Sequence, residues 1–186
     1  TVLSVPMILS SQTPNNYHLD RLSDNVINVA NAAGYDTYWL STQTRLGEHN
    51  TAITAISNKA KHQVWLPRHK KDGELIPYFI DAVKKRDKKK LIVVHINGSH
   101  PNFCSRYESS FEFFSGGMAM QDCYDNSILY TDYVVGELIE NLSHERSAIV
   151  YTSDHGLVKA KDTDEFYVHG ANDFNVDGYK VPMLVW

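Results

Sequence analysis

Short apolar runs alternate with segments of helical periodicity along most of the chain. Strand-like apolar runs occur at residues 36–40, 63–66, 91–96, 148–152 and 181–186. Apolar residues spaced three and four positions apart predict helices at residues 25–30, 52–60, 74–86 and 124–142. Apolar strands that alternate with amphipathic helices are typical of a parallel sheet covered on both faces. The pattern therefore predicts an α/β fold with three layers, α/β/α, and a mostly parallel central sheet.

Polar segments follow three of the predicted strands directly, at residues 41–44, 97–100 and 153–155. In such sheets ligands bind beyond the carboxyl ends of the strands, so we expect the three segments to meet at one edge. Residues 97–122 predict a loop-rich insertion between a central strand and the longest helix. His95 shares a strand face with Leu91 and Val93, which favours a core histidine over a functional one.

Asp154 and His155 place an acid beside an imidazole just after the fourth apolar run. Neighbouring side chains of a strand point to opposite faces, so the two meet at one centre only if the chain has turned out of the sheet. A carboxylate oxygen and an imidazole nitrogen suit zinc or manganese. For an isolated Asp-His-Gly, a helix-capping aspartate beside an exposed histidine is an equally good interpretation. His100 and His169, each near a glycine in a predicted loop, favour the site.

Composition limits the classes of protein that the chain can represent. With 186 residues, 42% of them hydrophobic, it fits one domain with a core. The net charge is -4, and the lysines gather at the predicted helix end at residues 84–90, so nucleic-acid binding is not expected. No apolar run is long enough to span a bilayer and no signal peptide is visible, so we expect a soluble piece.

The chain has two cysteines, Cys104 and Cys123. Both lie in polar, loop-like sequence, which favours a disulfide and an oxidising compartment, while a pair of buried thiols is the alternative interpretation. A second open question is the first residue. Thr1 as an amino-terminal nucleophile would indicate a hydrolase built on two stacked antiparallel sheets. The alternation of helices and strands disfavours that fold.

Six motifs follow one another along the whole chain. As an ordered set, they resemble the motifs of the phosphoethanolamine transferases of the alkaline phosphatase and sulfatase superfamily. This group includes the enzymes that modify lipid A and the lipopolysaccharide core. The stretch GYDTYWLSTQ at residues 34–43 most resembles the lipopolysaccharide-core branch. The motifs are Thr1-Val2-Leu3-Ser4-Val5-Pro6, Asn97-Gly98-Ser99-His100, the segment YDNSILYTD at residues 124–132, Ser153-Asp154-His155-Gly156, Tyr167-Val168-His169-Gly170 and Val181-Pro182-Met183-Leu184-Val185-Trp186.

The resemblance implies a role for each matching residue. Thr1 corresponds to a nucleophile that becomes phosphorylated and also binds the metal. Asp154 and His155 correspond to zinc ligands, and His100 and His169 to histidines that line the phosphoryl site.

The resemblance also implies cofactors and partners. One Zn2+ ion, or two, is expected, with Mn2+ less favoured. The donor would be phosphatidylethanolamine and the acceptor a lipopolysaccharide, at its core or lipid A. Ser41 and Gln43 lie where the family contacts the phosphoethanolamine group, although the local sequence differs. Leu157 stands where many lipid A modifying members have glutamate, so the acceptor is open.

In this family a further glutamate ligand and a transmembrane region precede the threonine. Residues 1–186 are therefore expected to be a catalytic-domain fragment that begins at the nucleophile. Its protein would be anchored in the inner membrane, with this domain in the periplasm.

Two other functions compete with transfer. A phosphatase or sulfatase of the same superfamily would use water in place of the acceptor, but sulfatases need a cysteine or serine that becomes formylglycine, and Thr1 cannot. A non-catalytic binding domain would have no physical reason to keep all five groups, namely Thr1, His100, Asp154, His155 and His169.

Overall fold

The computed structural model describes residues 3–18, 21–22, 24–45, 51–85, 89–117, 119–159, 167–168 and 176–186. Contacts divide the chain into two units. Unit 1 is Thr1–Lys70 with Glu74–Ile96, and unit 2 is Lys71–Gly73 with Asn97–Trp186. Within the described residues, no helix is both long and apolar enough to cross a bilayer.

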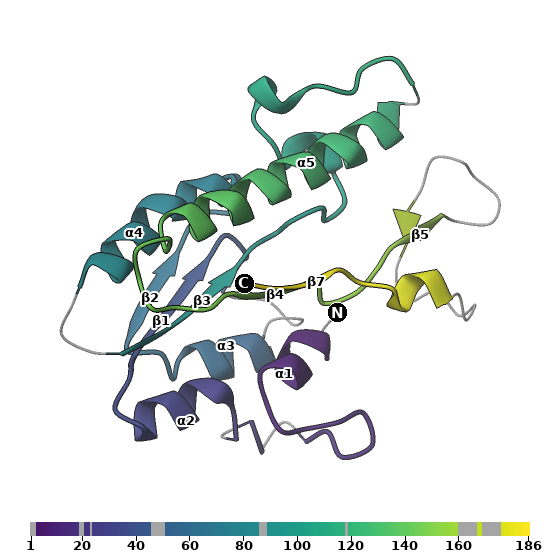
Figure 1. Cartoon of the computed structure of the whole chain (residues 1–186). Helices are drawn as coiled ribbons and strands as arrows, with labels where there is room; N and C mark the ends of the chain where they lie inside the picture. The colour runs from purple at the N-terminus through teal and green to yellow at the C-terminus, as the bar shows by residue number, and fades with distance from the viewer. Residues whose placement is uncertain are drawn as a thin grey trace. The chain divides into compact units, whose positions relative to one another are not determined.

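Unit 1 is built on a parallel three-stranded sheet (Figure 1). Strand β1 (Asp36–Ser41) lies between β2 (His62–Trp65) and β3 (Lys90–His95), and both pairings are parallel. The register places Ser41 opposite Trp65 on one side and His95 on the other. The predicted parallel central sheet is thus confirmed, and β1 and β3 end at the same edge.

Helices cover both faces of this sheet (Figure 1). On one face, Trp39 packs in a cluster with Ile27 of α2 (Val26–Ala32) and Ile56 of α3 (Thr51–Ser57), and all three side chains are 0% exposed. On the other face, α4 (Ile76–Lys84) buries Phe79 and Ala82. The short helix α1 (Ser4–Ile8) packs with α3. The three-layer prediction is therefore confirmed.

Local sequence signals explain where these helices begin and end. Asn25 caps α2, because its side chain accepts hydrogen bonds from the backbone N–H groups of Ile27 and Asn28. Gly34 follows the helix with φ +82°, a conformation that glycine adopts without strain. The helix expected at residues 74–86 is instead a 3-10 turn, η3 (Asp72–Leu75), followed by α4.

Unit 2 contains the longest helix, α5 (Ala119–Glu140), which starts five residues before the predicted position at 124. Strands β4 (Val150–Thr152) and β7 (Met183–Val185) pair with each other in antiparallel orientation, as a sheet of their own. The remaining elements are η4 (Phe103–Ser105), η5 (Ser109–Phe111), β5 (Val158–Lys159), β6 (Tyr167–Val168) and η6 (Val176–Tyr179).

Candidate active site

Asp154 and His155 turn toward each other immediately after β4. The strand ends at Thr152, and the chain bends at Asp154. The Nε2 atom of His155 lies 3.5 Å from Oδ1 of Asp154. The hydroxyl of Ser153 donates a hydrogen bond to the carbonyl oxygen of His155 at 2.8 Å and stabilises the turn. The two adjacent side chains thus face each other because the chain has left the strand.

The His155 ring is oriented by its other nitrogen. Nδ1 lies 2.9 Å from the carbonyl oxygen of Gly156. Since a carbonyl only accepts, this contact requires a proton on Nδ1, and Nε2 is the ring nitrogen that faces Asp154. A histidine that ligates a metal has this arrangement, with the second nitrogen donating to a carbonyl.

The spacing of these two atoms fits a zinc ion. Zn–N and Zn–O bonds are about 2.0–2.2 Å long, so two ligands at a tetrahedral angle are about 3.3–3.5 Å apart. The observed 3.5 Å agrees with that value. Among the described residues no group of three or more His, Cys, Asp or Glu side chains is arranged to hold an ion. The third predicted ligand, Thr1, lies outside the described residues, and so does His169.

His100 lies in the loop that follows β3, where Arg106 holds its backbone. Arg106 donates from Nε to the carbonyl oxygen of His100 at 3.0 Å and from Nη2 to that of Pro101 at 2.9 Å. Nη2 also lies 3.4 Å from Nδ1 of His100. The guanidinium therefore fixes the backbone around the imidazole and places a positive charge beside it. Sequence reasoning did not identify Arg106, although it is the only arginine in the predicted insertion.

Asp72 holds the beginning of the same loop. Its carboxylate accepts hydrogen bonds from the backbone N–H of Asn97 at 3.0 Å and of Gly98 at 2.8 Å. The residue is 3% exposed, and Gly98 has a positive φ of 53°. No sequence pattern indicates this contact, because Asp72 lies just outside a predicted helix and its partners are about 25 residues further along the chain.

Gly73 follows Asp72 and contacts α5. Its backbone N–H donates to the hydroxyl of Tyr130 at 3.2 Å. The Tyr130 side chain is 4% exposed and packs edge-on against Phe111 at 4.9 Å between ring centres. Burial is the main reason that the pKa of Tyr130 is raised to about 12. The hydrogen bond from Gly73 lowers the pKa, whereas the negative charges of Glu108 and Asp72 raise it further. Tyr130 is therefore a protonated anchor of the Lys71–Gly73 segment at neutral pH.

We expect Gly73→Ala to lower the free energy of unfolding by about 1 to 3 kcal/mol, the usual effect of overpacking. A Cβ on residue 73 would lie 2.6 Å from the Tyr130 hydroxyl oxygen. Urea denaturation measures the change, with Gly116→Ala as the control, because Gly116 lies outside any helix and a Cβ there meets nothing within 4 Å. If the hydroxyl causes the clash, Gly73→Ala should destabilise a Tyr130→Phe background far less than the wild type. An equal loss in both backgrounds would contradict this explanation.

Ser41 and Gln43, at the carboxyl end of β1, hold the end of β3. Ser41 is 0% exposed, and its hydroxyl lies 3.0 Å from Nδ1 of His95. Gln43 donates from Nε2 to the carbonyl oxygen of Ile96 at 2.8 Å. The half-buried His95 ring also packs against Trp39 at 5.2 Å, which supports the packing role expected of this histidine. Contact of Ser41 and Gln43 with a ligand stays a prediction.

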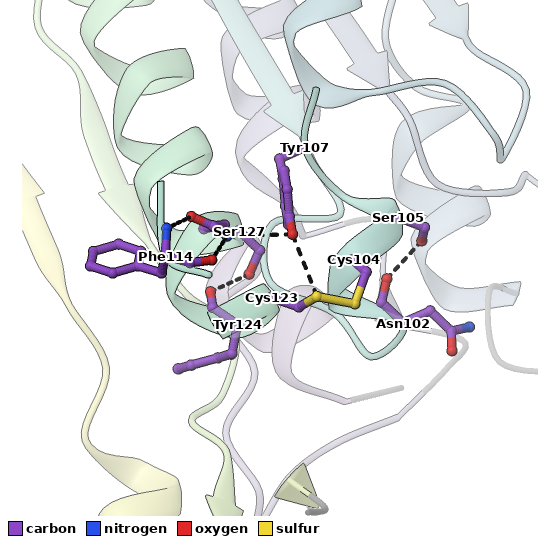
Figure 2. The surroundings of a disulfide bond; sticks show 9 residues. Asn102, Cys104, Ser105, Tyr107, Phe114, Cys123, Tyr124 and Ser127 are labelled. Carbon is purple, nitrogen blue, oxygen red and sulfur yellow. Dashed lines mark hydrogen bonds between the residues drawn. A yellow bond between two sulfur atoms is a disulfide. The ribbon is translucent and has the colours of Figure 1, made fainter. Parts of the chain in front are cut away.

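The predicted disulfide between Cys104 and Cys123 is confirmed, with the two Cα atoms 4.7 Å apart (Figure 2). Cys104 lies in η4, but Cys123 lies in the first turns of α5 and not in a loop, because the helix begins earlier than expected. Tyr107 donates from its hydroxyl to Cys123 Sγ at 3.4 Å. The bond therefore ties the segment after His100 to the longest helix.

Buried Asn126 holds the next part of the insertion against α5. Its Oδ1 accepts hydrogen bonds from the backbone N–H groups of Phe113 at 2.9 Å and Phe114 at 3.0 Å. Its Nδ2 donates to the carbonyl oxygen of Phe114 at 3.0 Å. Together with the disulfide, these bonds give the loop-rich insertion a fixed course despite its short elements.

Comparison with known sequences gives a family and two informative relatives. A family model described as Sulfatase matches residues 1–186. "Putative transferase YhbX" of Escherichia coli (strain K12) is 37% identical over 187 residues, covering 100% of this chain and 34% of that protein. "Phosphoethanolamine transferase OpgE" of the same strain is 31% identical over 176 residues, covering 89% of this chain and 33% of that protein. The chain thus spans about a third of these relatives.

Solved structures share the fold. The C-terminal periplasmic domain of EcEptC from Escherichia coli, in complex with Zn, superposes with a TM-score of 0.87 at 24% identity. That match covers 100% of this chain and 58% of the other. The C-terminal periplasmic domain of the phosphoethanolamine transferase EptC from Campylobacter jejuni gives 0.83 at 24% identity, covering 100% of this chain and 63% of the other.

Proposed function

The chain belongs to the sulfatase family, and from this premise we propose that it carries the catalytic residues of a phosphoethanolamine transferase. The donor would be phosphatidylethanolamine, and the acceptor a lipopolysaccharide at its core or lipid A. The observation that carries the proposal is the Asp154–His155 pair, with a spacing of 3.5 Å and a ring oriented by Gly156. The named activities of OpgE and EptC support the reaction type.

The proposed metal ligands are Asp154 through Oδ1, His155 through Nε2, and Thr1 through its hydroxyl. A glutamate from a segment before Thr1 would complete the set, as the family resemblance implies. Zinc bound there would lower the pKa of the threonine hydroxyl and neutralise charge on the phosphoryl oxygens. Manganese is less favoured, because an imidazole ligand suits zinc better. The Zn complex of the EcEptC domain supports this choice of metal.

The reaction would proceed in two steps at Thr1. In the first step the Thr1 oxygen, having lost its proton, forms a bond to phosphorus, and the bond to the diacylglycerol oxygen breaks. That oxygen takes up a proton and leaves. In the second step an acceptor hydroxyl or phosphate oxygen attacks the phosphothreonine, and the Thr1 oxygen is released. The cycle is therefore ping-pong.

His100 and His169 would contact the equatorial oxygens of the transferring group. Phosphoryl transfer depends mainly on positioning and on charge stabilisation, so their contribution would rest on fixed placement. For His100 that placement comes from Arg106, which holds the carbonyl oxygens of residues 100 and 101. The cation beside His100 would also favour an anionic group at this loop.

We propose a periplasmic location for this domain, in a protein anchored in the inner membrane. The solved relatives are described as C-terminal periplasmic domains. The Cys104–Cys123 disulfide supports the proposal, because such bonds persist in an oxidising compartment.

The intact protein, incubated with phosphatidylethanolamine and no acceptor, should carry phosphoethanolamine on Thr1. Peptide mass spectrometry detects this adduct. Thr1→Ala should abolish the adduct and the transfer, whereas Thr1→Ser should keep part of both, because the hydroxyl survives. Free phosphoethanolamine formed as fast with acceptor as without it would show a hydrolase instead. Transfer by Thr1→Ala at the wild-type rate would contradict the proposed nucleophile.

A further inference from the structure

The segment Lys71–Gly73 belongs to unit 2, although the residues on both sides of it belong to unit 1. Each of its three residues bonds to a different part of unit 2. Lys71 donates from Nζ to the carbonyl oxygen of Ser105, Asp72 accepts from the start of the His100 loop, and Gly73 donates to Tyr130 of α5. The segment is therefore fixed in unit 2 on both sides of Asp72.

We propose that Asp72 is a positioning residue for His100, and that its buried carboxylate sets the course of the loop from β3 to the imidazole. This inference rests on the proposed function, because it assigns a role to a histidine of that site. Asp72 itself lies outside the set of groups proposed to touch the metal or the substrate.

The two hydrogen bonds of Asp72 are made at the start of the loop, where its direction away from β3 is determined. They go to the consecutive backbone N–H groups of Asn97 and Gly98, the first residues of unit 2 after β3. Gly98 has φ +53°, so the chain reverses its backbone twist at this point. An ionised carboxylate that accepts from both amides stabilises this conformation, since charge-assisted hydrogen bonds are about twice as strong as neutral ones.

The far end of the loop has its own restraint. Arg106 bonds to the carbonyl oxygens of His100 and Pro101, so the imidazole lies between two fixed points. Loss of either restraint would leave the other in place. Removing Asp72 should therefore move the loop without unfolding the disulfide-linked segment behind it.

The charge of Asp72 is also felt at Tyr151, elsewhere in unit 2. Burial raises the pKa of Tyr151, and the negative charge of Asp72 is the next cause. Tyr151 lies in β4, just before the turn that carries Asp154. The carboxylate thus acts electrostatically on β4 as well as bonding to the His100 loop.

The test replaces Asp72 with asparagine, which has the same shape but turns an amide N–H2 toward one of the two backbone donors. Asp81→Asn is the matched control, because Asp81 is exposed on α4. Asp72→Glu is a second variant that keeps the charge and shifts it by one methylene. Nuclear magnetic resonance follows the Asn97 and Gly98 amides and the His100 imidazole in the intact protein, and needs no activity.

Kinetics then distinguish positioning from general stability. Asp72→Asn should lower kcat/KM roughly tenfold to a hundredfold, as expected for a misplaced group, and Asp72→Glu should lose less. In a His100→Ala background, Asp72→Asn should cause no further loss, because the group that it positions is gone. A loss of the same size in both backgrounds would overturn the proposal.

The spectra test the positioning role of Asp72 even if no transferase activity is found. Absence of activity would contradict the proposed function but would not bear on that role. Shifted Asn97, Gly98 and His100 signals in Asp72→Asn, but not in Asp81→Asn, would still establish that Asp72 positions the histidine. Unchanged signals in a folded Asp72→Asn protein would overturn it, whatever the activity of the wild type.

Discussion

His155→Ala in the intact protein is expected to weaken zinc binding by more than about a hundredfold and to reduce transfer to background. Changes in residues that only support a ligand typically weaken metal affinity 10- to 100-fold, so loss of a ligand should exceed that range. Asp154→Ala should act in the same way, because its Oδ1 lies 3.5 Å from Nε2 of His155 and would share the ion. Zinc content after dialysis and turnover with phosphatidylethanolamine are the two measurements.

His144→Ala is the matched control for this prediction, since His144 is exposed after α5 and outside the proposed site. It should leave zinc content and turnover unchanged. Wild-type zinc content in both His155→Ala and Asp154→Ala would show that the metal binds elsewhere in the protein.

Removal of the disulfide is expected to lower the free energy of unfolding by about 3 kcal/mol. Cys104 and Cys123 are separated by 19 positions, and closing a loop of this size removes about that much chain entropy from the unfolded state. The double variant Cys104→Ala/Cys123→Ala should therefore unfold at a lower urea concentration, and a reductant should bring the wild type to the same midpoint.

The double variant is its own control, because reductant should not change it further. Alkylation of denatured, non-reduced wild type should find no free thiol. Two free thiols there, or a wild-type midpoint that reductant leaves unchanged, would contradict the bond and its stabilising effect.

The sheet and the Asp154–His155 turn could be predicted because their signals are local. An apolar run such as residues 91–96 predicts a strand from its own composition, and β3 covers Lys90–His95. Asp154 and His155 are adjacent, so a single bend decides whether they meet. The antiparallel pairing of β4 with β7 had no such signal, because an apolar run does not encode the direction of its partner.

Contacts between polar residues far apart in sequence could not be predicted. Asp72 and Gly98 are joined by a hydrogen bond of 2.8 Å, yet no periodic pattern relates an acid to a backbone amide. The start of α5 was missed for a different reason. Two glycines at positions 116 and 117 indicated a loop, but the Asp122 side chain accepts from the Gly117 N–H at 2.9 Å and holds the entry to the helix.

The place of Lys71–Gly73 limits how this protein can be divided for experiments. A truncation that starts at Asn97 would contain nearly all of unit 2, yet it would lack the carboxylate that accepts from its first two amides. It would also lack the backbone donor for the Tyr130 hydroxyl. The tripeptide and the His100 loop are separated in the chain by α4 and β3. A contiguous fragment that contains both must therefore include β3, which belongs to unit 1. A minimal version of unit 2 would need residues 71–73 supplied as a fused or rearranged segment, for example by circular permutation.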